Sequence, residues 1–254
     1  MSDKLSISEI KKIFDETDVS NLNGFIETFK SDDRSGVVNI IKRAHKRIDD
    51  YNKELERLKA MNYFENTYDN FEFICGIDEV GRGPFAGPVV AGAVILPKGF
   101  DIMYINDSKK LSEAKREKLN KIILENAIDA QVGVVSAWRI DEIDILRATY
   151  EAMRIAISKL KVKPDLLLND AVKIPEVDIK QVSIIKGDAK CKSIAAASIV
   201  AKVYRDHLME EYDKQYPQYE FAKNKGYGTA AHIDAIKKYG LCEIHRRSFT
   251  HSYV

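Results

Sequence analysis

Short apolar runs alternate with stretches of helical periodicity from Phe71 onward, and this alternation restricts the chain to an α/β fold. The first two runs, at 73–77 and 89–96, are predicted to pair as a hairpin because Gly and Pro residues lie between them. Further strands are predicted at 130–137, 165–168 and 181–185. Helices are predicted at 112–126, at 141–160, from about 188 past 204, and at 230–239. The pattern therefore predicts a mixed central sheet flanked by helices.

The first 70 residues lack this alternation and are predicted to form a small helical extension. Ser6 and Glu9 form a Ser-x-x-Glu capping box at the start of a helix over 6–14, and charges spaced for helix faces continue over 37–58. A polar segment at 62–70 is predicted to be the linker. The 254 residues thus divide into an extension at 1–70 and a larger domain at 71–254.

The composition is that of an ordinary globular protein, with 45% hydrophobic and 31% charged residues. The formal net charge is only +1, but 12 basic residues stand against 8 acidic ones between Lys186 and Arg247. Either a phosphate-binding surface or a solvated face would show such a local excess. The three cysteines are far apart and suggest neither a disulfide framework nor a zinc ribbon. No apolar stretch is long enough for a membrane span, so a cytoplasmic protein is expected.

Four acidic residues follow predicted strands and form the candidate catalytic centre. Asp78 and Glu79 come directly after the first strand, Asp170 ends an apolar run, and Asp188 follows the run at 184–187. Strands of α/β proteins deliver ligand-binding groups to one edge, where converging carboxylates require cations such as Mg²⁺ or Mn²⁺. Such ions suit phosphodiester hydrolysis by water. The alternatives are a solvated acidic turn at Asp78 and Glu79 and a helix N-cap at Asp188.

The glycines that follow the first strand allow a second interpretation. Gly81, Arg82 and Gly83 fit the start of a G-x-G-x-x-G/A fingerprint, which makes a dinucleotide-binding protein an alternative. That fingerprint must open a helix, whereas the residues after Pro84 lead into the predicted strand at 89–96. The glycines instead offer bare backbone that can approach a sugar or phosphate, with the Arg82 guanidinium beside it.

Three basic segments are candidate nucleic-acid contacts. Lys190 and Ser193, near the start of the long helix, are in place to meet phosphate oxygens, although a buried helix with charged edges would read the same. Tyr227 lies between two glycines in a basic loop, where a tyrosine stacks on a base or sugar or simply packs in a turn. Asn106 and Lys109 belong to a similar polar segment before the helix at 112–126.

Together these segments resemble ribonuclease HII, the type 2 ribonuclease H family, in the family's order over 71–249. Arg82 favours this family over its sister, ribonuclease HIII, which usually lacks an arginine between these glycines. The first 70 residues fall outside the shared domain, and longer bacterial members carry helical N-terminal extensions of this kind. The motifs that carry it are Gly76-Ile77-Asp78-Glu79-Val80-Gly81-Arg82-Gly83-Pro84, Asn106-Asp107-Ser108-Lys109-Lys110-Leu111, Lys186-Gly187-Asp188-Ala189-Lys190, Gly226-Tyr227-Gly228-Thr229 and His245-Arg246-Arg247-Ser248-Phe249.

The resemblance implies a ribonuclease H fold and assigns roles to the candidate residues. The four acids of the family match Asp78, Glu79, Asp170 and Asp188. The element Gly81–Gly83 matches the one that recognises a 2′-hydroxyl at an RNA-to-DNA junction, largely through backbone groups. Tyr227 matches the tyrosine that stacks at the following deoxyribose.

The implied activity is endonucleolytic cleavage on the 5′ side of a ribonucleotide, leaving 3′-hydroxyl and 5′-phosphate ends. The implied substrates are RNA:DNA hybrids and single ribonucleotides in duplex DNA, so that misincorporated ribonucleotides are removed. Mn²⁺ or Mg²⁺ is the expected cofactor, and a monomer with nucleic acid as its partner and no membrane is expected. A nucleic-acid-binding protein without catalysis is the remaining alternative.

Overall fold

The computed structural model describes residues 5–253, which fall into two compact units that divide between Ala60 and Met61. The first unit contains three helices, α1 (Ile7–Glu16), α2 (Leu22–Phe29) and α3 (Ser35–Met61), with a 3-10 turn, η1 (Val19–Asn21). Both hydrogen bonds of the predicted capping box form, because Ser6 accepts from the Glu9 amide and Glu9 accepts from the Ser6 amide. Helix α2 was not predicted from the sequence. Its apolar residues nevertheless follow helical spacing at positions 22, 25, 26 and 29.

The larger unit is built on a five-stranded mixed sheet with the strand order β3-β2-β1-β4-β5. Strand β1 pairs antiparallel with β2 and parallel with β4. The predicted hairpin between the first two strands and the predicted mixed sheet are therefore confirmed. The strands are β1 (Ile74–Val80), β2 (Val89–Ile95), β3 (Asp129–Val135), β4 (Leu166–Asp170) and β5 (Lys180–Ile184).

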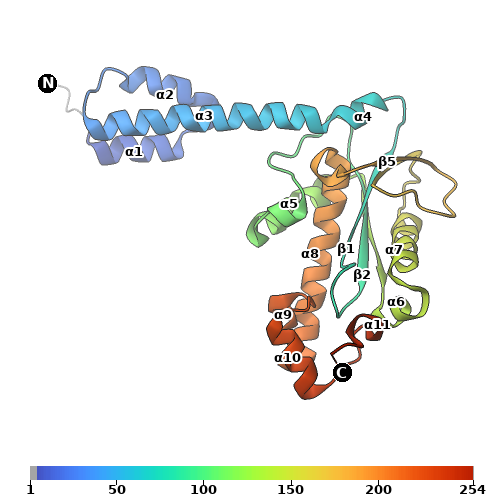
Figure 1. Ribbon diagram of the computed structural model, residues 1–254. Coiled ribbons are helices and arrows are strands. Elements are labelled where there is room, and N and C mark those ends of the chain that lie inside the picture. Colours follow the sequence, from blue (N-terminus) through green and yellow to red (C-terminus); the bar gives the residue numbers. More distant parts are fainter. Residues whose placement is uncertain (1–4, 254) are drawn as a thin grey trace. The chain divides into compact units, whose positions relative to one another are not determined.

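Helices cover both faces of this sheet, with α7 (Ile145–Lys159) against β2 and β3 on one face and α8 (Lys192–Gln215) against β1 and β2 on the other (Figure 1). The predicted helix at 141–160 is two helices, because Asp144 has a φ of 72° and interrupts it. No helix among residues 5–253 has the length and apolar character to cross a membrane. The other elements are α4 (Tyr63–Thr67), η2 (Ser108–Lys110), α5 (Glu113–Asn126), α6 (Ala137–Ile143), η3 (Gly187–Ala189), η4 (Pro217–Tyr219), α9 (Phe221–Asn224), α10 (Ala230–Tyr239) and α11 (Arg247–Thr250).

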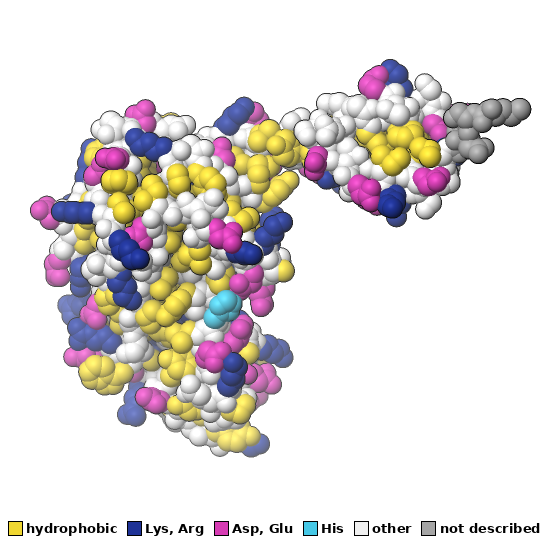
Figure 2. Space-filling model, turned by 180° about the vertical axis from the view of Figure 1, so that it is seen from behind, with side chains coloured by type: hydrophobic (Ala, Val, Ile, Leu, Met, Phe, Trp, Pro, Cys, Tyr) yellow, Lys and Arg dark blue, Asp and Glu magenta, His cyan; other side chains and the backbone are white. Residues whose placement is uncertain are grey.

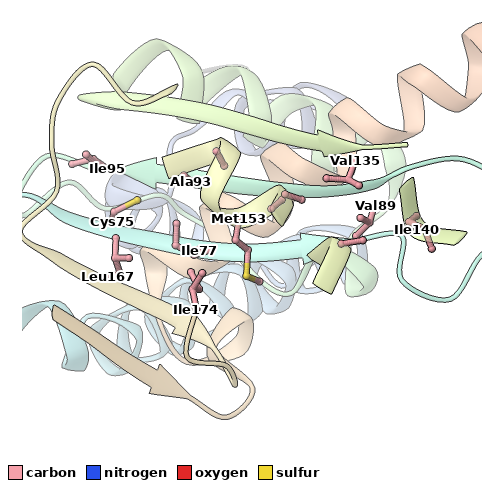
Figure 3. Close-up of a cluster of buried hydrophobic side chains, with 14 residues drawn as sticks. Cys75, Ile77, Val89, Ala93, Ile95, Val135, Ile140, Met153, Leu167 and Ile174 are labelled. Carbon is pink, nitrogen blue, oxygen red and sulfur yellow. The ribbon is translucent and has the colours of Figure 1, made fainter. Parts of the chain in front are cut away.

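The side chains of β1 alternate between two different environments. Cys75 and Ile77 enter the apolar cluster beneath α6 and α7, together with Met153 (Figure 3). Gly76 faces α8, and a Cβ atom built on it would lie 2.1 Å from the Ser193 carbonyl carbon. Helix α8 therefore packs its backbone directly on the strand, and its small residues at 195–198 allow this close approach.

The polar segment 62–70, predicted as a linker, carries the short helix α4 and belongs to the larger unit. Glu65 Oε1 accepts a hydrogen bond of 2.9 Å from the Ser193 amide, and the Asn62 amide donates to Asp101 over 2.8 Å. The two compact units divide between Ala60 and Met61, so this segment packs with the larger unit. The composition of the segment did not reveal them because polar residues suit a solvated loop and a polar contact equally.

Candidate active site

Asp78 and Glu79 occupy the end of β1, opposite Gly92 and Ala91 of β2. Asp78 is 5% exposed, and its Oδ1 accepts a hydrogen bond of 2.8 Å from the Glu79 amide. An interaction with the Ser198 side chain on α8 lowers the pKa of the same carboxyl group. Because the sheet face toward α8 is closed by helix packing, Asp78 is buried, while the Glu79 side chain on the other face is 14% exposed.

The other two acids reach the same end of the sheet from distant parts of the chain. Asp170 ends β4, the parallel neighbour of β1, and its Oδ1 accepts a hydrogen bond of 2.7 Å from the Gly187 amide. This bond fixes the turn η3, which carries Asp188. The N-cap of α8 is Cys191, so the alternative in which Asp188 caps the long helix is wrong.

Burial and mutual repulsion perturb the two carboxyl groups on β1. Burial raises the pKa of Asp78 well above its ordinary value, and the charges of Glu79 and Asp170 raise it further. Burial also raises the pKa of Glu79, against the opposing effect of Arg82 and Lys109. Arg82 Nη1 lies 3.3 Å from Glu79 Oε1, so this arginine forms an ion pair with the acid.

Asp188 belongs to the same group of charges. Burial raises its pKa, followed by the repulsion of Asp107 and Asp170, whereas Lys109 lowers it. The acids are thus close enough to repel, although no three of the described His, Cys, Asp or Glu side chains already enclose a metal position. A donor set of carboxylate oxygens fits a hard divalent cation, whose charge would relieve this repulsion.

An open pocket of about 500 Å³ lies beside Glu79, whereas Asp78, Asp170 and Asp188 do not line it. It brings Glu79 together with Lys109 and Tyr227, which come from three separate segments of the sequence. Gly83 lies directly beside Tyr227, because a Cβ atom built on this glycine would be 3.8 Å from the ring. The remaining lining residues are Val80, Gly81, Arg82, Gly83, Ile145 and Phe249.

The other predicted substrate contacts do not line this pocket. The Asn106 side chain accepts from the Asp107 amide over 2.9 Å, and Lys190 is exposed after η3. Ser193 is 2% exposed and lines a different cavity, of about 130 Å³, beside α4. Its amide is bonded to Glu65, and the structure therefore leaves no surface at Ser193 for a phosphate oxygen.

The glycine run that resembles a dinucleotide fingerprint joins two antiparallel strands. Gly81 and Gly83 lie between β1 and β2, and no helix follows them before Val89. A pyrophosphate group would therefore meet no helix N-terminus here, and the dinucleotide-binding alternative is wrong.

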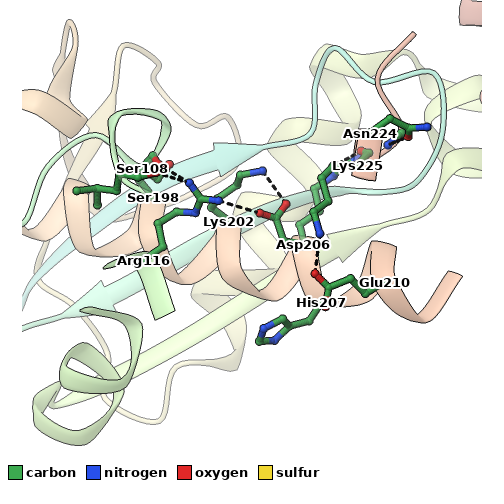
Figure 4. Close-up of polar contacts among 12 residues, drawn as sticks. Ser108, Arg116, Ser198, Lys202, Asp206, His207, Glu210, Asn224 and Lys225 are labelled. Atoms are coloured by element: carbon green, nitrogen blue, oxygen red, sulfur yellow. Dashed lines mark hydrogen bonds and ion pairs between the residues drawn. The ribbon is translucent and has the colours of Figure 1, made fainter. Parts of the chain in front are cut away.

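A polar network that the sequence did not reveal connects η2 with α8 (Figure 4). Ser108 Oγ lies 2.8 Å from Ser198 Oγ, and Arg116 Nη2 lies 3.5 Å from Asp206 Oδ2. Since Ser198 also contacts Asp78, the network fixes the loop that carries Lys109 against the acidic centre. Sequence spacing gave no signal for these contacts because 90 residues separate the two serines.

Charge is mixed over the face of the larger unit shown in Figure 2, where Lys and Arg side chains are interspersed with Asp and Glu. No large patch of a single sign of charge is visible on that face. The positive charges that can attract phosphate here are the individual cations that line the pocket, Arg82 and Lys109.

Solved structures with this architecture define the class. Ribonuclease H2 from Pyrococcus horikoshii is 27% identical, with a TM-score of 0.59 over 71% of this chain and 96% of that one. Ribonuclease HII from Archaeoglobus fulgidus, solved in complex with PCNA, is 27% identical with a TM-score of 0.58 over 68% and 93%. The fold is thus that of the ribonuclease H class.

Sequence comparison identifies the family within that class. The ribonuclease HII model matches residues 75–252, and a ribonuclease HII N-terminal domain model matches residues 6–69. Ribonuclease HII of Lachnoclostridium phytofermentans is 55% identical over 96% of both chains, and that of Clostridioides difficile is 51% identical over 98% of both. The chain belongs to the ribonuclease HII family and has its ribonuclease H endonuclease activity. The helical extension therefore matches an N-terminal domain of the same family over residues 6–69.

Proposed function

We propose that this chain cleaves on the 5′ side of a ribonucleotide, in RNA:DNA hybrids and at single ribonucleotides in duplex DNA. The products would be 3′-hydroxyl and 5′-phosphate ends, and the role would be removal of misincorporated ribonucleotides. The pocket that joins Glu79, the Gly81–Gly83 turn and Tyr227 carries this proposal. It sets a carboxylate beside exposed backbone and an aromatic ring, which suits a phosphodiester next to a sugar.

Asp78, Glu79, Asp170 and Asp188 are the residues proposed to hold Mg²⁺ or Mn²⁺. When bound, such ions supply an activated water and stabilise the oxygen that leaves. Asp188 lies partly exposed with a raised pKa, so it is suited either to complete the ion site or to give a proton to the leaving 3′ oxygen.

The remaining groups of the pocket position the substrate. Tyr227 is 45% exposed, which leaves its ring face free to stack on a sugar. Arg82 and Lys109 are exposed cations beside the acids and would contact the flanking phosphates.

The pocket is complete within one chain, which supports action as a monomer. Three free thiols among the described residues suit the reducing cytoplasm.

A duplex DNA with one embedded ribonucleotide tests the proposal directly. With Mg²⁺ or Mn²⁺, the parent protein should cut once, 5′ of the ribonucleotide, while an all-deoxy duplex stays intact. Asp78→Asn should lower the cleavage rate by at least about a hundredfold and keep duplex binding. Asp178→Asn, at an exposed acid outside the pocket, is the matched control and should cut at the parent rate. An intact ribonucleotide strand, or equal rates for Asp78→Asn and the parent, would refute the proposed site.

A further inference from the structure

Two arginines are buried beneath the Gly81–Gly83 turn. Arg205 and Arg246 are both 0% exposed, and neither forms an ion pair with a carboxylate in the part of the chain that the structure describes. A buried cation is strongly disfavoured unless other groups replace its water. Both guanidinium groups are surrounded by backbone carbonyl oxygens instead, which makes them an unusual structural element of the site.

Arg246 binds the turn itself. Its Nη2 donates to the Gly81 carbonyl over 2.5 Å, and its Nη1 donates to the Arg82 carbonyl over 3.0 Å. The same guanidinium also donates to the Gly87 carbonyl, over 2.9 Å from Nε and 2.8 Å from Nη2. Phe249, which lines the pocket, covers this group with its ring centroid 5.2 Å from the guanidinium carbon.

Arg205 binds the segment that leads from the turn into β2, and its position requires glycine at residue 81. It donates to the carbonyls of Pro88, Ala86 and Lys225 over 2.9, 3.1 and 2.9 Å. A Cβ atom at Gly81 would lie 2.3 Å from Arg205 Nε, and the φ of Gly81 is +88°. No other residue type fits this position without displacing the guanidinium.

Holding the carbonyls inward determines where the neighbouring amides point. No described peptide bond is cis, so the carbonyl of each residue and the N–H of the next face opposite directions. The inward carbonyls of Gly81 and Arg82 therefore direct the N–H groups of Arg82 and Gly83 outward. Neither N–H has an acceptor among the hydrogen bonds of residues 5–253.

We propose that Arg246 is a positioning residue for ribose specificity: it fixes the turn so that the Arg82 and Gly83 amides meet a 2′-hydroxyl oxygen. Arg246 does not touch the substrate in this scheme. The inference rests on the proposed function, since it explains how the turn recognises the hydroxyl. A cation bound to the carbonyls also polarises the same peptide groups, which strengthens their N–H donors. It gives the His245–Phe249 motif a role that the sequence analysis did not find.

The charge of Arg246 persists at neutral pH. Burial, and then the charge of Arg205, lower the pKa of Arg246 to about 9, which leaves the group protonated at pH 7. Lysine at this position would keep the charge, but a single ammonium group cannot reproduce the planar fork that reaches three carbonyls. Arg246→Lys therefore separates geometry from charge.

The experiment compares binding of two duplexes in EDTA, one with a single ribonucleotide and one all-deoxy. The parent should bind the ribonucleotide duplex more tightly. Arg246→Lys should bring the ratio of the two affinities close to one with little change for the all-deoxy duplex, and should lower kcat/KM by about tenfold once metal is added. Arg247→Lys, at the exposed neighbouring arginine, is the matched control and should keep the parent ratio.

The outcomes separate this inference from the proposed function. A parent protein without preference for the ribonucleotide overturns both. A parent that prefers the ribonucleotide, with the same ratio in folded Arg246→Lys, overturns only the role of Arg246. If Arg246 had a purely structural role, Arg246→Lys would lower the melting temperature and weaken binding of both duplexes equally. That result would also overturn the role of Arg246 in ribose specificity.

A measurement on the parent covers the case in which Arg246→Lys does not fold. Amide exchange by NMR should show fast exchange at Arg82 and Gly83 in the free protein. The ribonucleotide duplex should slow that exchange, and the all-deoxy duplex should not. Protection of both amides in the free protein would mean that they face inward and would overturn the inference.

Discussion

Replacing Gly76 by alanine tests whether close packing of α8 on β1 holds the acidic centre together. A Cβ atom at this position would lie 2.1 Å from the Ser193 carbonyl carbon and 2.5 Å from the Ile194 amide nitrogen. Both contacts are to backbone atoms, so no side-chain rotation relieves them. Helix α8 would have to move away from the strand.

The size of that movement sets the expected effects. Ordinary contact begins at 3.4 Å, so the 2.1 Å approach requires a shift of about 1.3 Å. Overpacking of this kind costs about 1–3 kcal/mol, and backbone contact favours the upper value. The shift would also separate Asp188, in the turn before α8, from Asp78 on β1. A misplacement of about 1 Å can lower a rate by about a hundredfold.

Urea unfolding followed by circular dichroism gives the stability of Gly76→Ala, and the single-ribonucleotide duplex gives its cleavage rate while it is folded. Gly24→Ala is the matched control, because a Cβ atom there meets no atom within 4 Å and the residue lies within α2. That change should stabilise the N-terminal unit by about 0.5–1 kcal/mol and leave cleavage unchanged. The packing argument fails if Gly76→Ala unfolds at the parent's urea concentration and cuts at the parent's rate.

Three further changes have defined outcomes. Burial, and then the charge of His232, lower the pKa of His245 to about 4. The free energy of unfolding should therefore fall by up to about 3 kcal/mol between pH 6.5 and pH 4, because the unfolded chain binds a proton that the folded protein does not. Urea unfolding across this range should show a weaker dependence of stability on pH in His245→Gln than in the parent. Glu65→Ala removes the acceptor for the Ser193 amide at the start of α8 and should lower the free energy of unfolding in urea by about 1 kcal/mol. Glu65→Gln keeps an acceptor oxygen and should retain most of the parent stability. Asp78→Asn removes a buried carboxylate with a raised pKa, so calorimetry in EDTA at pH 7 should show a higher melting temperature than the parent, and a lower one would contradict the assigned repulsion.

Local sequence patterns determined much of the architecture. Apolar runs and glycines predicted the β1–β2 hairpin, and the capping box at Ser6 predicted the start of α1. Asp78 and Glu79 were found because they directly follow the apolar run at 73–77, although both lie within β1 itself. These features depend on neighbours within a few residues, so the sequence displays them without knowledge of the fold.

Only the tertiary structure decided which distant groups meet. Parallel pairing of β1 with β4 brings Asp170 to the acids of β1, and its bond to Gly187 fixes the turn of Asp188. The break at Asp144 and the burial of Ser193 depend in the same way on the packing of whole elements. No periodicity or spacing records such contacts, because they arise only when strands and helices far apart in sequence pack together.

Arg246 shows most clearly what the sequence determines and what only the fold determines. In the sequence it is one of two adjacent arginines in the His245–Phe249 motif, and nothing there tells the two apart. In the structure Arg247 is exposed, whereas Arg246 is buried against carbonyl oxygens more than 150 residues away. The residue type determined that a charged, planar donor was available, and the fold determined that its donors hold the turn beside the active site.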